Sequence, residues 1–528
     1  MEIQKRSSGH GAVPAVLAVL LAGLFASSSA MAQSKKSWIT VGDAAFAHLQ
    51  KVAPQVFAKE SKLLRTNDSK AGVAQTEKVH LVEVDDEQML KLSVAVHNEL
   101  KRCGGFMFHG SEAEGRQALT KQSSPSTLAM TFSRPAYVID NQTTVSPVLA
   151  NMQASNIATT IADLATFVNR YYTTTGGTDA SNWLKTKWSG MATGRSDITV
   201  TQFAHTGYNQ KSVILTINGT DNASEVVVLG AHLDSINSSG TGETTRAPGA
   251  DDDASGIASL TEALRAMISA GYKPRRTIKM IGYAAEEVGL KGSAAIAQNF
   301  KTNNVNVVGV MQLDMTNYKG SAGDIYMYTD YTDSLQNDFV VKLITTYQPT
   351  LTIGYDKCGY ACSDHASWTA QGYPSSMPFE TTFTQDNPYI HSANDTFANA
   401  GGQANHSLKF ARLGASFAME LGSDGPGTTV PDTVATYSGS LTAGQTRSFG
   451  PFKVGINNTL KAETTGTGDV DLYVRKGAVP TTMTYTCKSD GATATEACSV
   501  SMTAAGDVYV LLNGYNASTY NLKVTYKP

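Results

Sequence analysis

Four apolar runs, separated in part by stretches with helical periodicity, constrain the fold of this chain more than any other feature of its sequence. The runs are Ser212–Ile217, 226–231, 277–284 and 307–313. Between the later runs, apolar residues recur with helical spacing over 254–270 and 290–300. A similar helical pattern covers 155–171. Continuous apolar strands that alternate with helices indicate an α/β domain whose sheet is covered on both faces.

Side chains that bind metals or transfer protons stand directly after three of these runs. They are His232 and Asp234 after the second run, Glu286 and Glu287 after the third, and Asp314 after the fourth. In an open α/β sheet, functional groups gather at the carboxyl ends of the strands. Three consecutive aspartates at 251–253 precede the helix predicted over 254–270, and His391 lies far downstream. We therefore expect these groups to meet at one edge of the sheet.

The three aspartates have two interpretations. One carboxylate at a helix N-terminus is favoured by the free N–H groups and by the helix dipole, but a cap needs only one. Adjacent carboxylates repel one another unless a cation lies among them, and burying several acidic clusters together is unfavourable without cations. Imidazole mixed with carboxylate favours zinc, whereas an all-oxygen set favours calcium or magnesium. The combined pattern predicts a metal site.

The N-terminus has the order of a secretory signal. Two basic residues, Lys5 and Arg6, precede an apolar run over 12–25, and the small-residue motif at 30–32 ends the segment. A membrane anchor is the alternative, but the run is short for a span of ~20 residues. We predict that 1–32 is a signal peptide, that the protein is secreted, and that it has no stable membrane insertion after processing.

Charge and cysteine content limit the classes of function and the cellular compartments that suit this chain. With 16% charged residues and a formal net charge of −3, the chain lacks the electrostatic footprint of a nucleic-acid-binding protein. Cys358 and Cys362, like Cys487 and Cys498, are spaced to close short disulfide loops in an oxidising compartment. A metal site at Cys358 and Cys362 is the alternative, but no nearby Cys or His set completes a tetrahedron. Cys103 is left over.

The sequence predicts several further segments. Residues 33–137 are charge-rich, with a strand pattern over 78–85, a helical pattern over 87–101 and no dense cluster of ligand-type residues. We interpret them as a pro-segment that assists folding and covers the site, and whose removal also removes Cys103. A permanent N-terminal domain is the alternative. The main α/β domain spans 138–422, and a linker rich in Gly, Pro and Thr spans 423–433. Short alternating strands over 434–528 indicate a C-terminal β-sandwich.

The motifs around the candidate ligands resemble those of a known family. They are GAHLDS at 230–235, APGADDDASG at 247–256, YAAEEVGL at 283–290, QLDMTNY at 312–318 and CGYACSDHASW at 358–368. In these motifs and their order, residues 146–422 resemble the secreted bacterial dizinc leucyl aminopeptidases of the co-catalytic zinc exopeptidase fold. The resemblance implies a mixed, largely parallel central sheet flanked by helices. The tail around 468–473 resembles the pre-peptidase C-terminal domain that often follows secreted bacterial proteases.

The resemblance implies two zinc ions per catalytic domain. His232 and Asp314 would complete one site, Glu287 and His391 the other, and Asp252 would bridge the two. Three protein ligands per zinc leave an open position, as catalytic zinc requires.

The resemblance also implies roles for residues beside the metals. Glu286 would be the general base, and Asp234 would hydrogen-bond His232 and fix its tautomer. Tyr360, in a loop clamped by Cys358 and Cys362, would donate a hydrogen bond to the tetrahedral intermediate. Helix capping is a sufficient role for the other two aspartates of 251–253.

A substrate pocket is implied as well. Its apolar lining would be Met377, Phe379, Phe383 and Ile390, for which ordinary core packing is the alternative. Asp386 departs from the family, because it stands where close relatives have an aromatic pocket residue.

These inferences predict a monomeric enzyme that acts on peptide or protein N-termini and removes N-terminal, preferably large apolar, leucine-like residues. A glutaminyl cyclase on the same fold is one alternative, but it would work with a single zinc. A carboxypeptidase would need a cation for the substrate carboxylate, and no Lys or Arg stands between Cys358 and His391. A non-catalytic binding protein would be marked by lost ligands, and none is lost.

Overall fold

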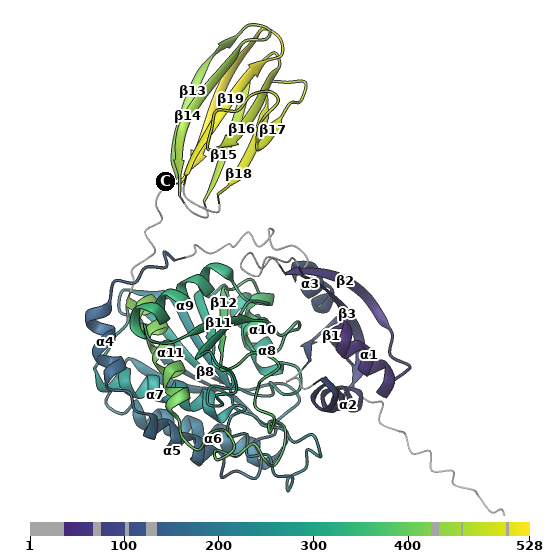
Figure 1. Cartoon of the computed structure of the whole chain (residues 1–528), viewed down its shortest axis with the longest axis vertical. Coiled ribbons are helices and arrows are strands. Elements are labelled where there is room, and N and C mark those ends of the chain that lie inside the picture. The colour runs from purple at the N-terminus through teal and green to yellow at the C-terminus, as the bar shows by residue number, and fades with distance from the viewer. Residues whose placement is uncertain are drawn as a thin grey trace, which may run out of the picture.

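The structure is a computed structural model, and it describes residues 36–66, 75–100, 105–122, 135–423, 432–455, 458–502 and 506–527. Figure 1 shows an N-terminal part in purple, a central part from blue to green, and a C-terminal part in yellow-green to yellow. The predicted signal peptide, Cys103 and most of the predicted linker lie outside the described residues. No helix in the described ranges is long and apolar enough to cross a membrane.

The N-terminal part is a four-stranded antiparallel sheet with helices, in the strand order β2-β3-β1-β4. Its elements are β1 (Lys36–Gly42), α1 (Asp43–Val52), β2 (Ala58–Thr66), β3 (Gln75–Asp85), α2 (Asp86–Ala95), the π-helical turn η1 (Val96–Leu100), β4 (Phe106–His109) and α3 (Glu112–Gln122). A capping box between Asp85 and Gln88 begins α2. The strand predicted over 78–85 is present, and the helix predicted over 87–101 ends as α2 at Ala95 and continues as η1.

The central part is built on an eight-stranded mixed sheet with the order β11-β10-β12-β9-β7-β8-β6-β5. Its strands are β5 (Ile198–Phe203), β6 (Ser212–Ile217), β7 (Asn222–His232), β8 (Arg276–Tyr283), β9 (Asn306–Gln312), β10 (Ile325–Tyr328), β11 (Ile353–Asp356) and β12 (Ser375–Phe379). Strand β7 pairs in parallel with both β8 and β9, β9 with β12, and β10 with β11. The pairs β12/β10, β8/β6 and β6/β5 are antiparallel. The prediction of a mixed sheet is therefore confirmed.

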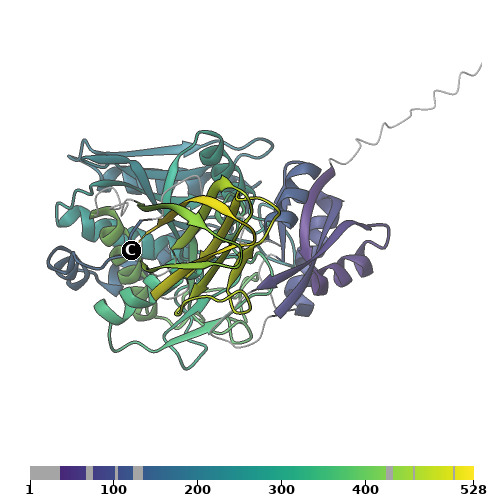
Figure 2. The ribbon, with the colours of Figure 1, turned by 90° about the horizontal axis from the view of Figure 1, so that it is seen from above.

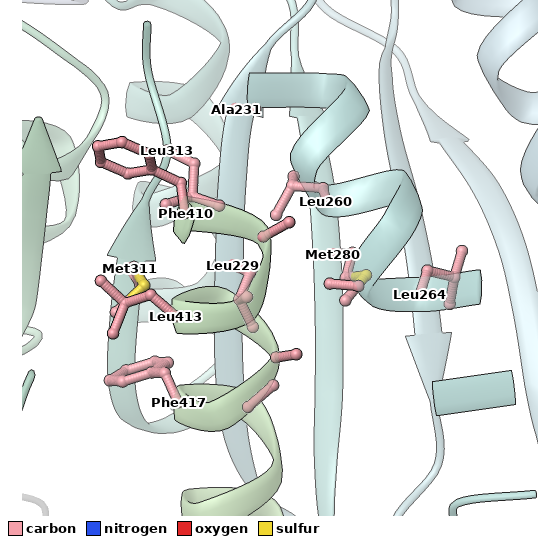
Figure 3. Packing of buried hydrophobic residues seen from close by; sticks show 14 of the residues in the cluster. Leu229, Ala231, Leu260, Leu264, Met280, Met311, Leu313, Phe410, Leu413 and Phe417 are labelled. Carbon is pink, nitrogen blue, oxygen red and sulfur yellow. The ribbon is translucent and has the colours of Figure 1, made fainter. Parts of the chain in front are cut away.

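Helices cover both faces of this sheet, as predicted. They are α4 (Gln142–Ala150), α5 (Ala154–Leu164), α6 (Thr175–Met191), α7 (Ala254–Ser269), α8 (Lys291–Thr302), α9 (Ser334–Tyr347), α10 (His365–Ala370) and α11 (Asn405–Ser423). Side chains alternate along β7, so that Leu229 packs on one face and Val228 on the other. Figure 3 shows Leu229 beside Leu413 of α11, with Leu260 of α7 nearby. Fully burying such a leucine stabilises the fold by roughly 1.5–3 kcal/mol.

The helix predicted over 155–171 ends earlier, at Leu164. The chain leaves the helix because the polar groups of Asn169 and Arg170 are bonded to other loops. The Asn169 side chain donates to the carbonyl oxygens of Gly242 and Thr245, at 3.0 and 2.9 Å. The apolar spacing that continued through Tyr171 was therefore misleading.

The C-terminal part consists of two four-stranded antiparallel sheets, with the orders β13-β20-β15-β18 and β14-β19-β16-β17. Its strands are β13 (Thr433–Leu441), β14 (Thr446–Val454), β15 (Thr459–Thr467), β16 (Val470–Lys476), β17 (Cys487–Ser489), β18 (Glu496–Ser501), β19 (Gly506–Gly514) and β20 (Ser518–Tyr526). Residues from both sheets, such as Leu472 and Leu522, share one hydrophobic cluster. The disulfide between Cys487 and Cys498 joins β17 to β18, and thus one sheet to the other. Figure 2 shows the strands of this part from above, in yellow-green and yellow.

Candidate metal centre

The ends of the three parallel central strands bring the predicted ligands together. His232 is the last residue of β7, Asp314 follows β9, and Glu287 follows β8. Backbone hydrogen bonds continue the register past the strands, from Leu233 N to Tyr283 O at 2.7 Å and from Leu313 N to Gly230 O at 2.8 Å. The ligand-type side chains therefore end at the same edge of the sheet.

Two groups of three ligand-type side chains share Asp252. His232 Nε2 lies 2.9 Å from Asp252 Oδ1 and 3.4 Å from Asp314 Oδ1. His391 Nε2 lies 3.1 Å from Asp252 Oδ2 and 2.9 Å from Glu287 Oε2. Within each group the ligand atoms all lie within 4.8 Å of one another, and all five residues are buried. The five residues proposed from the sequence as metal ligands are thus adjacent.

The chemistry of this cluster fits divalent cations. Buried oxygens of Glu286 and Glu287, their Oε1 atoms, have no hydrogen-bond partner in the described part of the chain. The charges of Asp252, Asp253 and Asp395 act on Arg170, which is fully buried. Its guanidinium is occupied by backbone carbonyls, including Leu233 O at 2.8 Å and Gly249 O at 2.9 Å. Imidazole and carboxylate donors that converge without protein cations between them suit zinc.

The pKa values of the clustered side chains also reflect negative charge that the protein does not compensate. Burial raises the pKa of Glu286 well above its ordinary value, with Asp314 adding to the shift, and burial raises that of Glu287 to about 7. Burial alone would lower the pKa of His391, but the charge of Glu287 and the bonds to Asp252 outweigh it and raise the pKa to about 10. Without a metal, the cluster therefore retains protons that metal ions would displace.

The loop that carries Asp252 is fixed by its neighbouring aspartates and glycines. Asp253 caps α7 by accepting from Gly256 N at 2.9 Å, and its other oxygen accepts from His232 N at 2.9 Å. A Cβ on Gly256 would lie 2.2 Å from Leu313 O, so only glycine allows α7 to begin this close to the end of β9.

The prediction of a capping role is right for Asp253 and wrong for Asp251. The Asp251 carboxylate instead accepts from Asn317 N at 3.1 Å and from Asn387 Nδ2 at 2.9 Å. It therefore ties the loop before α7 to the segments that follow β9 and β12.

Asp234 lies between the candidate ligands and the candidate base. Its two carboxylate oxygens accept from Glu286 N at 3.0 Å and Glu287 N at 3.2 Å. His232 Nδ1 lies 3.2 Å from the backbone oxygen of Asp234 and 3.5 Å from Oδ1. Asp234 thus orients the turn after β8 as well as the imidazole.

Two supporting residues were missed by the sequence reasoning. Asp395 accepts from Asp251 N at 3.0 Å and Asp252 N at 3.1 Å. Arg170 holds the loop around Gly249 by donating to the Gly249 carbonyl oxygen. Asp395 lies four residues after His391, which is the only sequence signal for it. Arg170 lies in a stretch with an apolar helical pattern, so nothing marked it.

An apolar cavity adjoins Asp314. It is lined by Asp314, Met315, Tyr328, Cys358, Tyr360, Cys362, Met377, Phe379, Phe383 and Asp386. The disulfide between Cys358 and Cys362 is present, as predicted. Of the four predicted pocket residues, Met377, Phe379 and Phe383 line this cavity. Ile390 packs into the same hydrophobic cluster without lining it.

The N-terminal part contacts the rim and the interior of this site. Phe108 N of β4 donates to Gly289 O at 2.9 Å, just after Glu287. His97 of η1 lies with its ring centroid 4.5 Å from that of His391. A segment over 33–137 that covers the site was predicted, but His97 was not identified, because a lone histidine in a helical pattern carries no distinguishing signal.

Comparisons with known proteins give a consistent picture. Residues 212–415 match the model described as peptidase family M28. A probable leucine aminopeptidase of Arthroderma otae is 36% identical over 287 residues, which cover 54% of this chain and 77% of that protein. Leucine aminopeptidase 1 of Penicillium rubens is 37% identical over 292 residues, or 52% of this chain and 74% of that protein. The crystal structure of the LapA aminopeptidase of Legionella pneumophila has a TM-score of 0.60 at 30% identity, covering 74% of this chain and all of that one.

Proposed function

This chain belongs to peptidase family M28, and on that premise we propose that it is a secreted dizinc aminopeptidase that removes N-terminal residues from peptides. The observation that carries the proposal is the pair of ligand groups that share Asp252. His232, Asp252 and Asp314 would hold one zinc, and Asp252, Glu287 and His391 the other.

Two bound zinc ions would supply Lewis-acid chemistry, activating a water and polarising the scissile carbonyl. Glu286 would take the proton from that water and pass it to the leaving amine, acting as general base and then general acid. A buried carboxylate with a raised pKa suits a group that must both accept and release a proton. Asp234 would hold the turn of Glu286 and the ring of His232 in place.

The cavity beside Asp314 would receive the side chain of the residue that is removed. Tyr360 lines it and would donate a hydrogen bond to the carbonyl oxygen as negative charge develops there. No Lys or Arg is among the described residues that line this cavity, so a substrate carboxylate has no cation to bind there. That composition favours an aminopeptidase over a carboxypeptidase.

We further propose that 33–137 is a pro-segment that covers the site, that 1–32 is a signal peptide, and that 434–528 is a pre-peptidase-type β-sandwich. The contacts of His97 and Phe108 with the site support the first proposal. The two disulfides favour an oxidising compartment and thus secretion. The C-terminal part has two sheets around its own hydrophobic cluster, which supports the third. We expect the processed enzyme to act as a monomer.

Turnover of matched peptides by the purified processed protein tests this function. We expect cleavage of a leucyl peptide with a free N-terminus, none after N-acetylation, about two zinc ions per chain, and loss of activity in a chelator that zinc restores. Removal of C-terminal residues from the acetylated peptide would indicate a carboxypeptidase. Ammonia release from an N-terminal glutamine, without hydrolysis of the leucyl peptide, would indicate a glutaminyl cyclase.

A further inference from the structure

The cavity beside Asp314 contains one acidic side chain that the proposed mechanism does not use. Apart from Asp314 and Asp386, its lining consists of sulfur-containing and aromatic side chains, among them Met377, Phe379 and Phe383. Asp386 is partly exposed, and it lies in the loop between β12 and His391. A carboxylate in such surroundings loses much of its hydration, which costs free energy unless the charge is paired.

The Asp386 carboxylate has no lysine or arginine partner among the residues that the structure describes. Within the described ranges, no lysine or arginine lies within ion-pair distance of it, and the only basic group that acts on it appreciably is His391, a candidate metal ligand. The nearest lysine on the segment after Asp314 is Lys319, whose ammonium donates to the backbone oxygens of Ser321 and Ala322, at 2.7 and 2.9 Å.

The surroundings of Asp386 favour a positively charged ligand. Burial, with a smaller contribution from the charges of Asp252 and Asp251, raises the pKa of this carboxyl to about 7. A cation beside the carboxylate would offset both effects. The described residues that line the cavity include no Lys or Arg, so the cationic end of a bound side chain could pair with Asp386.

We propose that Asp386 makes this pocket select peptides whose N-terminal residue has a cationic side chain, lysine or arginine, over those that begin with leucine. The inference rests on the proposed aminopeptidase function. A lysine or arginine side chain combines an apolar stem with a charged end. The stem would pack on Met377, Phe379 and Phe383, and the charged end would pair with Asp386. A carboxylate in a protease side-chain pocket gives selectivity for basic residues by the same principle.

Kinetics on a matched substrate series test this selectivity. For the processed wild-type enzyme, kcat/KM should be higher for lysyl and arginyl substrates than for the norleucyl substrate, which has a neutral side chain of similar length. Asp386→Asn should lower kcat/KM for the two basic substrates by about 10- to 100-fold, the range for hydrogen bonds to charged groups. It should leave the norleucyl and leucyl values within about threefold. Asp338→Asn, a matched loss of one exposed carboxylate on α9, should change none of them.

The possible outcomes separate the selectivity from the function itself. Equal losses on all substrates in Asp386→Asn would mean that Asp386 binds the substrate's α-ammonium group, and would overturn the proposal. Efficient cleavage of leucyl but not lysyl substrates would overturn it while the aminopeptidase function stands.

Calorimetry of lysine amide and norleucine amide with the Glu286→Gln variant reports on the pocket without turnover. Tighter binding of lysine amide, lost in the double variant with Asp386→Asn, is expected; equal binding of the two amides would contradict the proposal.

Discussion

Glu286 and Glu287 are neighbours in the sequence, yet their carboxylates have different surroundings. Glu287 Oε2 lies 2.9 Å from His391 Nε2, within a group that can hold a metal. Glu286 belongs to neither group, and the charge of His232 is the main influence that opposes the rise in its pKa due to burial. Their backbone N–H groups both donate to Asp234, which fixes the stretch of backbone that carries the two side chains.

Substitution of each glutamate should therefore affect a different property. Glu286→Gln should keep both zinc ions and lower kcat by roughly 10²–10⁴-fold, the usual contribution of general acid–base catalysis. Glu287→Gln should reduce the zinc content towards one ion per chain. Metal analysis and kinetics on the same preparations check this, and zinc loss in Glu286→Gln with full occupancy in Glu287→Gln would reverse the assignment.

Three of the five candidate ligands could be predicted from the sequence because each follows an apolar run, whereas Asp252 and His391 were assigned through the family resemblance. His232, Glu287 and Asp314 share this signal. Arg170 and Asp395 could not be found in the same way, because they act through backbone groups of a distant loop. Their importance depends on which carbonyl or N–H group is left without a partner after folding, and the sequence alone does not contain that information.

Elements with a strong periodic pattern were the ones that the sequence predicted. Strands β6 to β9 are apolar on both faces and came out close to their predicted bounds. Strands β10 and β11 have four residues each, too few to establish a period. Helix α6 was missed because its second and third residues are glycines, Gly176 and Gly177, which are poor helix formers. The Thr174 hydroxyl caps it by accepting from Gly177 N at 3.1 Å.

The η1 turn contributes a contact that depends on the N-terminal part remaining attached. His97 packs against His391, so the unprocessed chain should hydrolyse leucyl or lysyl substrates poorly. His97→Ala should raise the activity of the intact precursor by about 2- to 10-fold, the value of a lost ring contact. The processed forms of both chains should have the same kcat/KM, which serves as the control.

Mass spectrometry must accompany this measurement. The active species is expected to lack 33–137, and the precursor assay is valid only on chains shown to be intact. An intact wild-type chain with full activity would contradict the pro-segment, and an unchanged precursor activity in His97→Ala would show that His97 contributes nothing to inhibition.

At the scale of the whole molecule, the candidate metal site and the C-terminal part belong to regions with separate hydrophobic cores. All candidate ligands and Glu286 precede Ser423, and the cluster around Leu472 contains no residue of the central part. Truncation after Ser423 should therefore leave kcat on small substrates essentially unchanged, within about twofold. Loss of small-substrate turnover in a folded, zinc-loaded truncation would show that the C-terminal part contributes to the site.

Each disulfide of the described chain lies inside one part of the molecule, and neither crosses from one part to another. A single cut between Gln122 and Pro135 would therefore leave the N-terminal part held by non-covalent contacts alone. While the chain is continuous, the tether keeps that part at an effective concentration on the order of millimolar. After such a cut the two pieces would obey mass action, and if the protein is secreted as proposed, dilution outside the cell would drive them apart. Export into a large volume would then complete the activation that proteolysis begins.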